Sequence, residues 1–299
     1  MSELEKQAGS RVKGIFLHAA VLLLFFGSVF LVCYPFVSNY LMGLNQEGEV
    51  TGYEQEVQEA NDEEIAAELE AARKYNQSLF GSVILTDPFD PARQQEENLE
   101  YDQLLNLGGD SVMGVIEIPA IHVSLPIYHG TEEEVLQKGA GHMWNTSLPV
   151  GGAGTHAVIT GHTGLSSAKL FTDLELLETG DVFLIHVLGD ILAYQVDQIK
   201  IVKPDETNDL RIDPEQDYVT LVTCTPYGIN SHRLLVRGTR IPYEEAEEIL
   251  QKNISREEES IWMEEYKKAL VAGIVILVLI LAAFILTGKR RKARKKKAS

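Results

Sequence analysis

The stretch TLVTCTPYGINSHRLLVRGTR, residues 220–240, joins two runs of β-branched and aliphatic residues through a segment that contains proline, glycine and asparagine. Such runs, bounded by turn residues, predict two β-strands, at 218–224 and 232–241. Cys224 ends the first run, and Arg233 stands near the start of the second. The stretch therefore indicates β structure with one unpaired thiol at a strand end.

Five earlier segments have the same texture of short β-type runs cut by turn residues: 112–118, 123–129, 156–160, 181–188 and 191–202. Seven short strands within about 130 residues predict a closed β-barrel or a β-sandwich. The intervening segment 170–181 predicts a short helix ended by Gly180. The fold class expected from these patterns is mainly β.

The segments on either side of the strands are acidic. Residues 53–80 predict an amphipathic helix, because apolar residues recur there at three- and four-residue steps. These positions are Val57, Ile65, Leu69 and Ala72. Residues 85–111 contain two prolines and no sustained periodicity, which predicts a loop. Residues 243–268 predict a second acidic amphipathic stretch.

Two apolar segments predict membrane helices. Residues 14–37 contain no acidic residue, lysine or arginine, and are long enough to cross ~30 Å of hydrocarbon. A cleaved signal peptide is the alternative, but its apolar core spans only about 7–15 residues, so we favour an uncleaved signal anchor. Residues 269–288 predict a second transmembrane helix.

Charge predicts the orientation of these helices. The tail, residues 289–299, carries eight basic and no acidic side chains, so the positive-inside rule keeps it cytoplasmic. Residues 1–13 show a weak bias in the same direction, and two crossings then put residues 38–268 outside the cell. The chain has a formal net charge of −18 despite that tail. This acidic balance argues against nucleic acid as a partner.

The two cysteines cannot pair, because Cys33 lies in the first apolar segment and Cys224 in the exterior part. Extracellular domains usually use cysteines in disulfides. A lone exterior thiol is therefore either a small buried hydrophobe or a reactive group. A reactive thiol needs a nearby cation or base, since an ordinary one is only a few per cent ionised at pH 7.

His162 is the strongest candidate for that base. It follows the strand 156–160 in a glycine-flanked turn, and loops at strand ends often carry functional groups. His142 lies in another glycine-flanked loop that can border a cleft, whereas strand alternation sends His232 and Arg233 to opposite faces. The remaining exterior histidines are expected to be structural or exposed: His122, His129, His156 and His186.

Arg233 has two interpretations, a surface ion pair or a donor that holds an oxyanion or a substrate carbonyl. A metal site is not indicated, because the exterior part has no second cysteine and no paired-histidine spacing. No cofactor is expected.

At this point the residues resemble a known family. TLVTC followed by TPYGINSHRLLVRG is similar to the TLxTC and arginine signature of sortases, the cysteine transpeptidases of Gram-positive cell surfaces. AVITGHTGL…AKLFTDLELLETGD resembles the histidine segment of that family, and GAGHM…TSLPVGG precedes it. The resemblance covers residues 112–241. It implies the eight-stranded sortase β-barrel, with Cys224 as nucleophile, His162 as general acid/base and Arg233 stabilising the oxyanion or substrate.

Two features resemble class C sortases, which polymerise pilins. That class typically has a C-terminal membrane helix and an N-terminal lid with an Asp-Pro-aromatic motif. Asp87, Pro88 and Phe89 match the lid motif, which implies that Asp87 pairs with Arg233 and that Phe89 covers the thiol. Thr163 departs from the arginine expected after the histidine in many members, which leaves the substrate preference open.

The resemblance implies two-step acyl transfer. The thiolate attacks the Thr–Gly bond of an LPxTG-like sorting signal and forms a thioacyl enzyme. His162 protonates the departing amine and then helps to deprotonate the incoming one. That amine is a pilin lysine in a pilin-polymerising enzyme and a cell-wall precursor in an enzyme that anchors proteins to peptidoglycan. Both acceptors remain open, with pilin polymerisation the leading hypothesis.

A membrane-tethered binding or scaffold protein with an inert cysteine is the alternative from a different class, and a general cysteine protease is a weaker one. The leading hypothesis divides the chain into eight segments. These are a cytoplasmic N-terminus (1–13), a signal anchor (14–37), an acidic helical segment (38–84), a lid loop (85–111), the catalytic barrel (112–242), an acidic stalk (243–268), a transmembrane helix (269–288) and a cytoplasmic tail (289–299).

Overall fold

The computed structural model of the chain describes residues 3–79, 86–90, 99–165, 167–253, 260, 262–264 and 266–279. Two compact units are present, one formed by residues 1–32 with 259–299 and one by residues 33–258. The second unit contains every strand and every candidate site residue.

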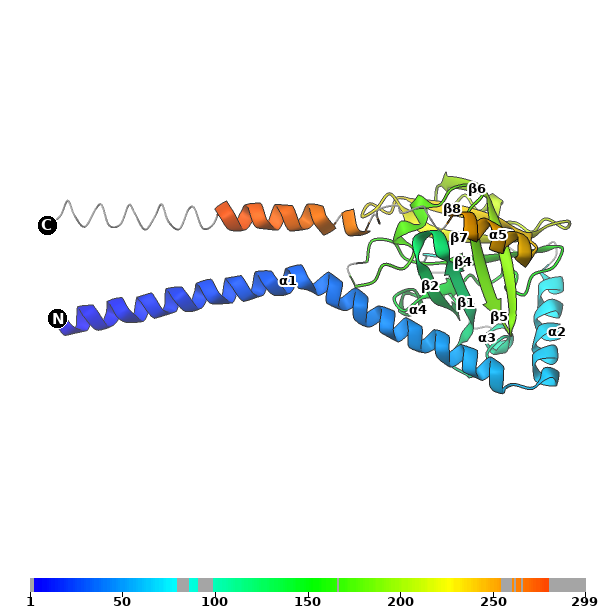
Figure 1. The fold of residues 1–299 in the computed structure, drawn as a ribbon, viewed down its shortest axis with the longest axis horizontal. Helices are drawn as coiled ribbons and strands as arrows, with labels where there is room; N and C mark the ends of the chain where they lie inside the picture. The colour runs from blue at the N-terminus through cyan, green and yellow to red at the C-terminus, as the bar shows by residue number, and fades with distance from the viewer. Residues whose placement is uncertain are drawn as a thin grey trace. The chain divides into compact units, whose positions relative to one another are not determined.

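Eight strands form a closed barrel in the order β1-β2-β3-β4-β7-β8-β6-β5 (Figure 1). The strands are β1 Val112–Ile118, β2 Val123–His129, β3 Ala140–His142, β4 Thr155–Thr160, β5 Val182–Val187, β6 Asp190–Val202, β7 Asp217–Thr225 and β8 His232–Ile241. Seven of these are the predicted strands, and the mainly β, closed-barrel prediction is confirmed. The eighth strand, β3, has only three residues and lies in the segment that the sequence predicts to be a loop.

Two pairings define the part of the barrel that carries the stretch 220–240. Strands β7 and β8 are antiparallel, and β7 also pairs with β4 in parallel. Successive residues of β7 pack into different clusters: Leu221 joins the main core, while Val222 joins a smaller cluster with Leu235 of β8. The smaller cluster therefore lies on the outer face of the barrel wall.

The barrel interior is closely packed around aromatic rings. Phe183 and Tyr194 are fully buried and stack with ring centroids 5.6 Å apart. Gly238 on β8 lies against them, and a Cβ atom at this position would stand 2.6 Å from the Phe183 ring. The glycine is therefore required by a close approach of backbone to ring.

We predict that Gly238→Ala destabilises the barrel by about 1–3 kcal/mol, because packed cores accept extra volume only through strain. Chemical denaturation of the detergent-solubilised chain would measure this loss. Gly52→Ala is the matched control, since no atom lies within 4 Å of its added Cβ and the site is helical. An unchanged midpoint for Gly238→Ala would contradict the packing argument.

The acidic segment predicted as one helix over 53–80 forms two helices instead. Helix α1, Glu3–Glu59, ends within this segment at Glu59, and α2, Asp62–Ser78, begins after a break of two residues. Asn61 caps α2: its side chain accepts from the backbone N–H of Glu64, and the Glu64 carboxylate accepts from the backbone N–H of Asn61. This capping box starts a new helix, which the apolar periodicity alone did not reveal.

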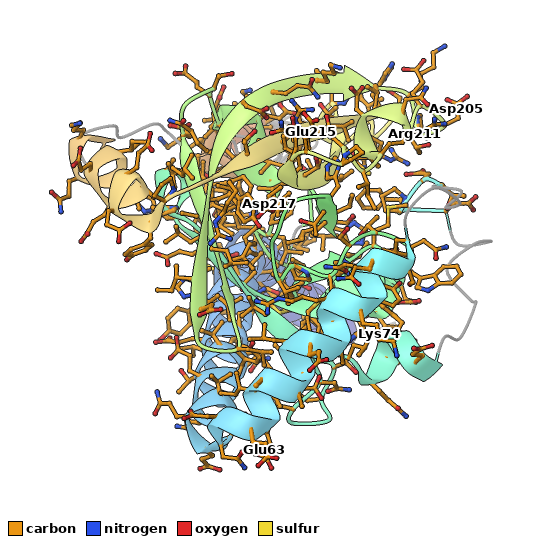
Figure 2. All side chains as sticks on the ribbon, turned by 90° about the vertical axis from the view of Figure 1, so that its right-hand side faces the viewer. Glu63, Lys74, Asp205, Arg211, Glu215 and Asp217 are labelled. Atoms are coloured by element: carbon orange, nitrogen blue, oxygen red, sulfur yellow. The ribbon has the colours of Figure 1, made fainter. Side chains whose placement is uncertain are left out.

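Polar side chains hold the N-terminal helices against the barrel. The Tyr53 hydroxyl of α1 accepts from the backbone N–H of Leu188 at 2.8 Å. The Asn76 side chain of α2 accepts from the backbone N–H of Leu148 at 2.7 Å and donates to its carbonyl at 3.1 Å. Figure 2 shows α2 lying along the side of the barrel. Both side chains are buried, so these hydrogen bonds belong to the interior of the protein and not to its surface.

The segment predicted as a helix over 170–181 contains only a short 3₁₀ helix, η2 Thr172–Leu176. Leu170 has φ +43°, and Leu177 is extended, so regular helix cannot continue at either end. The other short helices are α3 Leu99–Gln103, η1 Pro119–Ile121, α4 Glu133–Leu136 and η3 Asn208–Leu210.

Helix α5, Tyr243–Asn253, forms the first part of the predicted stalk and packs on the outside of the barrel. Its Ala246 is fully buried against Val182 and Leu184 of β5 and Ala193 of β6. The helix therefore covers an outer face of the sheet (Figure 1).

In the described part of the chain one helix is long and apolar enough to cross a membrane: residues Ala20–Glu59 of α1 contain an 18-residue window with a mean hydropathy of 2.4. This indicates a membrane anchor in the region where the sequence predicts one. The second predicted span, 269–288, is helical up to residue 279, and its remainder lies outside the described residues. Residues 85 and 91–98 of the predicted lid loop, and the basic tail, also lie outside the described residues.

Candidate active site

The pairing of β7 with β8 places Cys224 directly opposite Arg233. Cys224 is two residues after Val222, and Arg233 is two residues before Leu235, so both side chains share the outer face with that small cluster. Cys224 is 7 % exposed and Arg233 9 % exposed. A thiol and a permanently charged guanidinium are thus buried together at one end of two paired strands.

Residues 86–90 lie over this end of the barrel. Asp87 forms a tight turn: its carboxylate accepts from the backbone N–H of Phe89 at 3.3 Å, and its carbonyl accepts from that of Asp90 at 3.1 Å. The same carboxylate accepts two hydrogen bonds from Arg233, from Nε at 2.8 Å and from Nη2 at 2.6 Å. This bidentate, charge-assisted pair occupies the edge of the guanidinium formed by Nε and Nη2.

Phe89 lies between the arginine and the histidine. Its ring centroid is 4.9 Å from the Arg233 Cζ and 5.7 Å from the centroid of the His162 ring. It also packs against the small outer cluster that contains Val222. The turn therefore places one carboxylate and one aromatic ring beside Arg233.

His162 follows β4 in a turn that several backbone contacts hold in place. The Thr223 hydroxyl of β7 donates to the Gly161 carbonyl at 2.7 Å, and the Phe171 N–H donates to the His162 carbonyl at 3.1 Å. A Cβ at Gly161 would come within 2.6 Å of the Phe171 ring, so a glycine is required there. The imidazole Nε2 lies 3.0 Å from a carboxylate oxygen of Glu133.

Its surroundings make Cys224 a weak acid. The pKa of the thiol is raised to about 11. Burial is the largest cause, the charge of Arg233 lowers the pKa, and the charge of Asp87 raises it. The carboxylate that neutralises Arg233 thus also disfavours the thiolate. Among the described residues, no group of three or more histidine, cysteine, aspartate or glutamate side chains could hold a metal ion.

His142 is not at this site. It lies in β3 and is fully buried, with Nδ1 2.9 Å from the Tyr101 hydroxyl and Nε2 2.8 Å from the Ser147 carbonyl. Burial lowers its pKa to about 4, and His156 is lowered to about 4 for the same reason. The prediction that His142 lies in a loop bordering a cleft is wrong. The glycines around it allow the backbone of β3 to pair closely with β2 and β4 instead.

We predict that His142 makes the fold sensitive to acid. In the folded state the buried His142 stays neutral down to a pH of about 4, whereas in the unfolded state it is protonated below its ordinary pKa of about 6.5. The unfolded state therefore binds more protons between these two values, and the free energy of unfolding falls as the pH is lowered from about 6.5 to 4. In His142→Gln, the loss of unfolding free energy between pH 7.5 and 4.5 should be smaller than in the parent by about 2–3 kcal/mol.

Chemical denaturation of the detergent-solubilised chain at the two pH values would measure this difference. His186→Gln serves as the control, since His186 is partly exposed on β5. Equal losses in His142→Gln and the parent would contradict the prediction.

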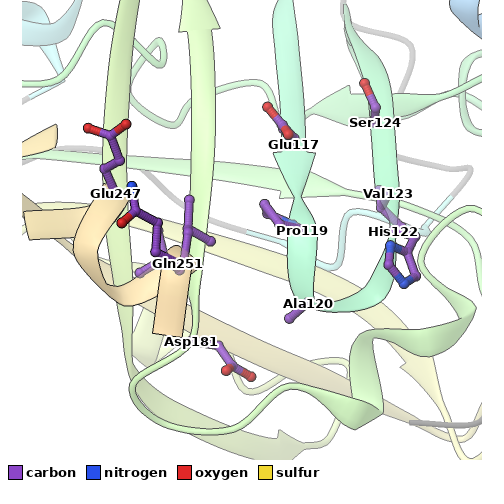
Figure 3. A pocket seen from close by; sticks show the side chains of 11 residues that line it. Glu117, Pro119, Ala120, His122, Val123, Ser124, Asp181, Glu247 and Gln251 are labelled. Carbon is purple, nitrogen blue, oxygen red and sulfur yellow. The ribbon is translucent and has the colours of Figure 1, made fainter. Parts of the chain in front are cut away.

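A separate cavity of about 530 Å³ lies between β1, η1, β2, β5 and α5. Figure 3 shows the carboxylates of Glu117, Asp181 and Glu247 around it, with His122 at its side. In the order of the closed barrel, three strands separate β1 from β7 in either direction. The cavity is therefore on the opposite side of the barrel from Cys224.

Sequence reasoning missed Glu133 and Tyr101. Glu133 is one of three consecutive glutamates and carries no signal that separates it from its neighbours. Tyr101 lies in the segment predicted to be an irregular loop, although its hydroxyl is buried and contacts both His142 and the backbone N–H of Gly130.

The fold and these side chains define the class: a closed eight-stranded barrel with an unpaired cysteine beside an arginine, and a histidine on the adjoining strand end. The family model described as "Sortase domain" matches residues 116–241. The match covers the barrel and includes Cys224, His162 and Arg233.

Solved structures agree with this class. The crystal structure of sortase C-1 from Streptococcus pneumoniae is 47 % identical, with a TM-score of 0.61, and the match covers 66 % of this chain and 99 % of that one. Sortase C-1 from Actinomyces oris is 50 % identical, with a TM-score of 0.55, and the match covers 60 % of this chain and 99 % of that one.

Among curated proteins, Sortase D of Bacillus subtilis is 30 % identical over 131 residues, which amount to 43 % of this chain and 63 % of that protein. The chain thus spans less than two thirds of this relative. With the two solved structures, these matches show that the chain belongs to the sortase family. The class C resemblance read from the sequence is confirmed.

Proposed function

We propose that the protein is a membrane-anchored cysteine transpeptidase whose resting state is closed by its own lid. The observation that carries this proposal is the buried thiol of Cys224 opposite Arg233, with Nε and Nη2 of the guanidinium both engaged by Asp87. An inert structural cysteine would need no such cover. Cys224 is assigned as nucleophile, His162 as general acid/base and Arg233 as the group that holds the reacting carbonyl.

The reaction begins when the lid turn leaves the site. Arg233 then loses its carboxylate partner, and its charge favours the Cys224 thiolate. The thiolate attacks the threonine carbonyl of an LPxTG-like sorting signal, and the guanidinium donates to the developing oxyanion. His162 gives a proton to the departing glycine amine, which leaves a thioester on the cysteine.

In the second step an amine attacks the thioester carbonyl. His162 takes a proton from this amine, an amide bond forms, and the Cys224 sulfur departs. We assign the amine to a pilin lysine, because solved structures of class C sortases resemble this chain at 47–50 % identity. The product is a pilin polymer that grows by one isopeptide bond in each cycle.

The proposed location is the outer face of the cell membrane, with two membrane helices and both ends of the chain in the cytoplasm. The apolar helix near the N-terminus and the basic tail support this arrangement. Both substrates would then be delivered at the membrane surface on which the barrel stands.

A test combines the membrane-embedded chain with a purified pilin that carries an LPxTG-like signal. Pilin ladders that resist sodium dodecyl sulfate are the expected product, and mass spectrometry should find the pilin as a thioester on Cys224. A thioester with transfer only to a cell-wall precursor would support the anchoring sortase instead. Absence of any thioester would favour the non-enzymatic binding protein.

A further inference from the structure

His162 has a carboxylate partner outside the cysteine, histidine and arginine set. Its Nε2 lies 3.0 Å from Oε2 of Glu133, which begins helix α4. The His162 side chain is 15 % exposed, whereas that of Glu133 is 64 % exposed. The ring is thus largely enclosed, and the acid approaches it from the solvent side.

The Glu133 carboxylate is itself oriented. Its other oxygen, Oε1, accepts from the side-chain amide of Gln137, one helical turn later, at 2.9 Å. Hydrogen bonding from Gln137 lowers the pKa of Glu133, and the nearby His162 lowers it further against the effect of burial. The group therefore stays ionised and presents Oε2 to the imidazole.

Helix α1 braces both segments that carry this pair. Asn39 accepts from the backbone N–H of Lys169 at 2.8 Å, in the loop that begins with His162. Gln46 donates to the Lys138 carbonyl at 2.8 Å, just after α4. Met42, at helical spacing between them, packs against the barrel core. One face of α1 thus fixes the spacing of the histidine loop and the glutamate helix.

We propose that Glu133 is a positioning residue for His162: its carboxylate accepts the Nε2–H, so that Nδ1 is the nitrogen that exchanges protons in the reaction. A carboxylate behind a histidine fixes the ring orientation and stabilises the imidazolium that forms during proton transfer. The inference rests on the proposed transpeptidase function and adds a fourth side chain to it.

Glu133 acts on proton delivery, so its importance depends on the leaving group. An amine must be protonated to leave, whereas the alcohol of an ester leaves with much less help from an acid. Loss of Glu133 should therefore slow cleavage of a sorting peptide with a Thr–Gly amide. A depsipeptide, with an ester in place of that amide, should acylate Cys224 at nearly the parental rate in a single turnover, before the second step that both substrates share.

The experiment compares Glu133→Ala with Glu134→Ala, an exposed neighbour in the same helix. Both are made in the full chain with an Asp87→Ala background, so that lid opening does not limit the rate. Glu133→Ala should lower kcat on the amide about fivefold, with KM unchanged and the single-turnover acylation rate on the depsipeptide retained. Glu134→Ala should change neither substrate. Glu133→Asp should recover part of the loss.

An equal loss on amide and ester, or no loss on the amide, would overturn the assignment of Glu133. If the Asp87→Ala parent cleaves neither substrate, the transpeptidase function itself fails, which separates the two proposals. Thermal unfolding of each variant identifies a loss that comes from misfolding, and Glu133→Gln then replaces Glu133→Ala as the variant that decides.

Discussion

Cys224→Ala is expected to abolish transpeptidation, with a loss of at least about 10³-fold in kcat/KM, because the thioester intermediate has no substitute in this site. The barrel should remain folded, since the side chain is small and Cβ is retained. Production of pilin ladders and capture of a thioester, both followed by mass spectrometry, measure the loss.

Two further variants show whether the effect is specific to the Cys224 thiol. Cys33→Ala removes the other thiol, which lies in α1, and should leave activity unchanged. Arg233→Lys keeps a positive charge but loses the planar fork, so we expect it to reduce activity strongly without abolishing it. Ladder formation by Cys224→Ala at the parental rate would disprove the role of the thiol.

The lid variants Asp87→Ala and Phe89→Ala are expected to make Cys224 far more reactive towards thiol reagents. In the closed site the pKa of the thiol is about 11, so only about 0.1 % is thiolate at pH 8. Loss of the carboxylate and of the cover should return the pKa to its ordinary value near 9 or below. The labelling rate at pH 8 should then rise about 100-fold.

The pH dependence gives a second readout. The pKa of the closed thiol is raised, so labelling of the parent should increase steeply only towards pH 11, and that of the variants at least about two pH units earlier. Phe89→Tyr keeps the ring next to Arg233 and is the matched control, with slow labelling expected. Equal rates in all four proteins at pH 8 would rule out a lid of this kind. A Cys33→Ala background removes labelling of the other cysteine.

The sequence predicted the strands well because alternation and turn residues are local signals. The pair 218–224 and 232–241 matches β7 and β8 closely, and the signature around Cys224 pointed to the barrel. The short strand β3 could not be predicted, because three residues with a central glycine carry no periodicity. Its hydrogen bonds come from β2 and β4 on either side, which is tertiary information.

Some residues of the candidate site were likewise predictable from local sequence patterns, and others were not. Cys224 and Arg233 follow from strand pairing, but Asp87 is 146 residues from Arg233, and only family resemblance connects the two. Glu133 was missed because an exposed glutamate has no distinctive pattern. His142 was misplaced because the Tyr101 hydroxyl and the Ser147 carbonyl, which enclose it, come from segments without regular strand patterns.

The amide of Asn76 and the hydroxyl of Tyr53 bear on how short a chain can fold. A chain cut to residues 112–242 would keep every strand of the barrel, yet it would leave the backbone N–H groups of Leu148 and Leu188 without these acceptors. Unsatisfied buried donors cost about 1–3 kcal/mol each, a large part of the stability of a small domain. The N-terminal helices therefore contribute to the stability of the barrel, and we expect the shortest stably folded chain to begin within α1.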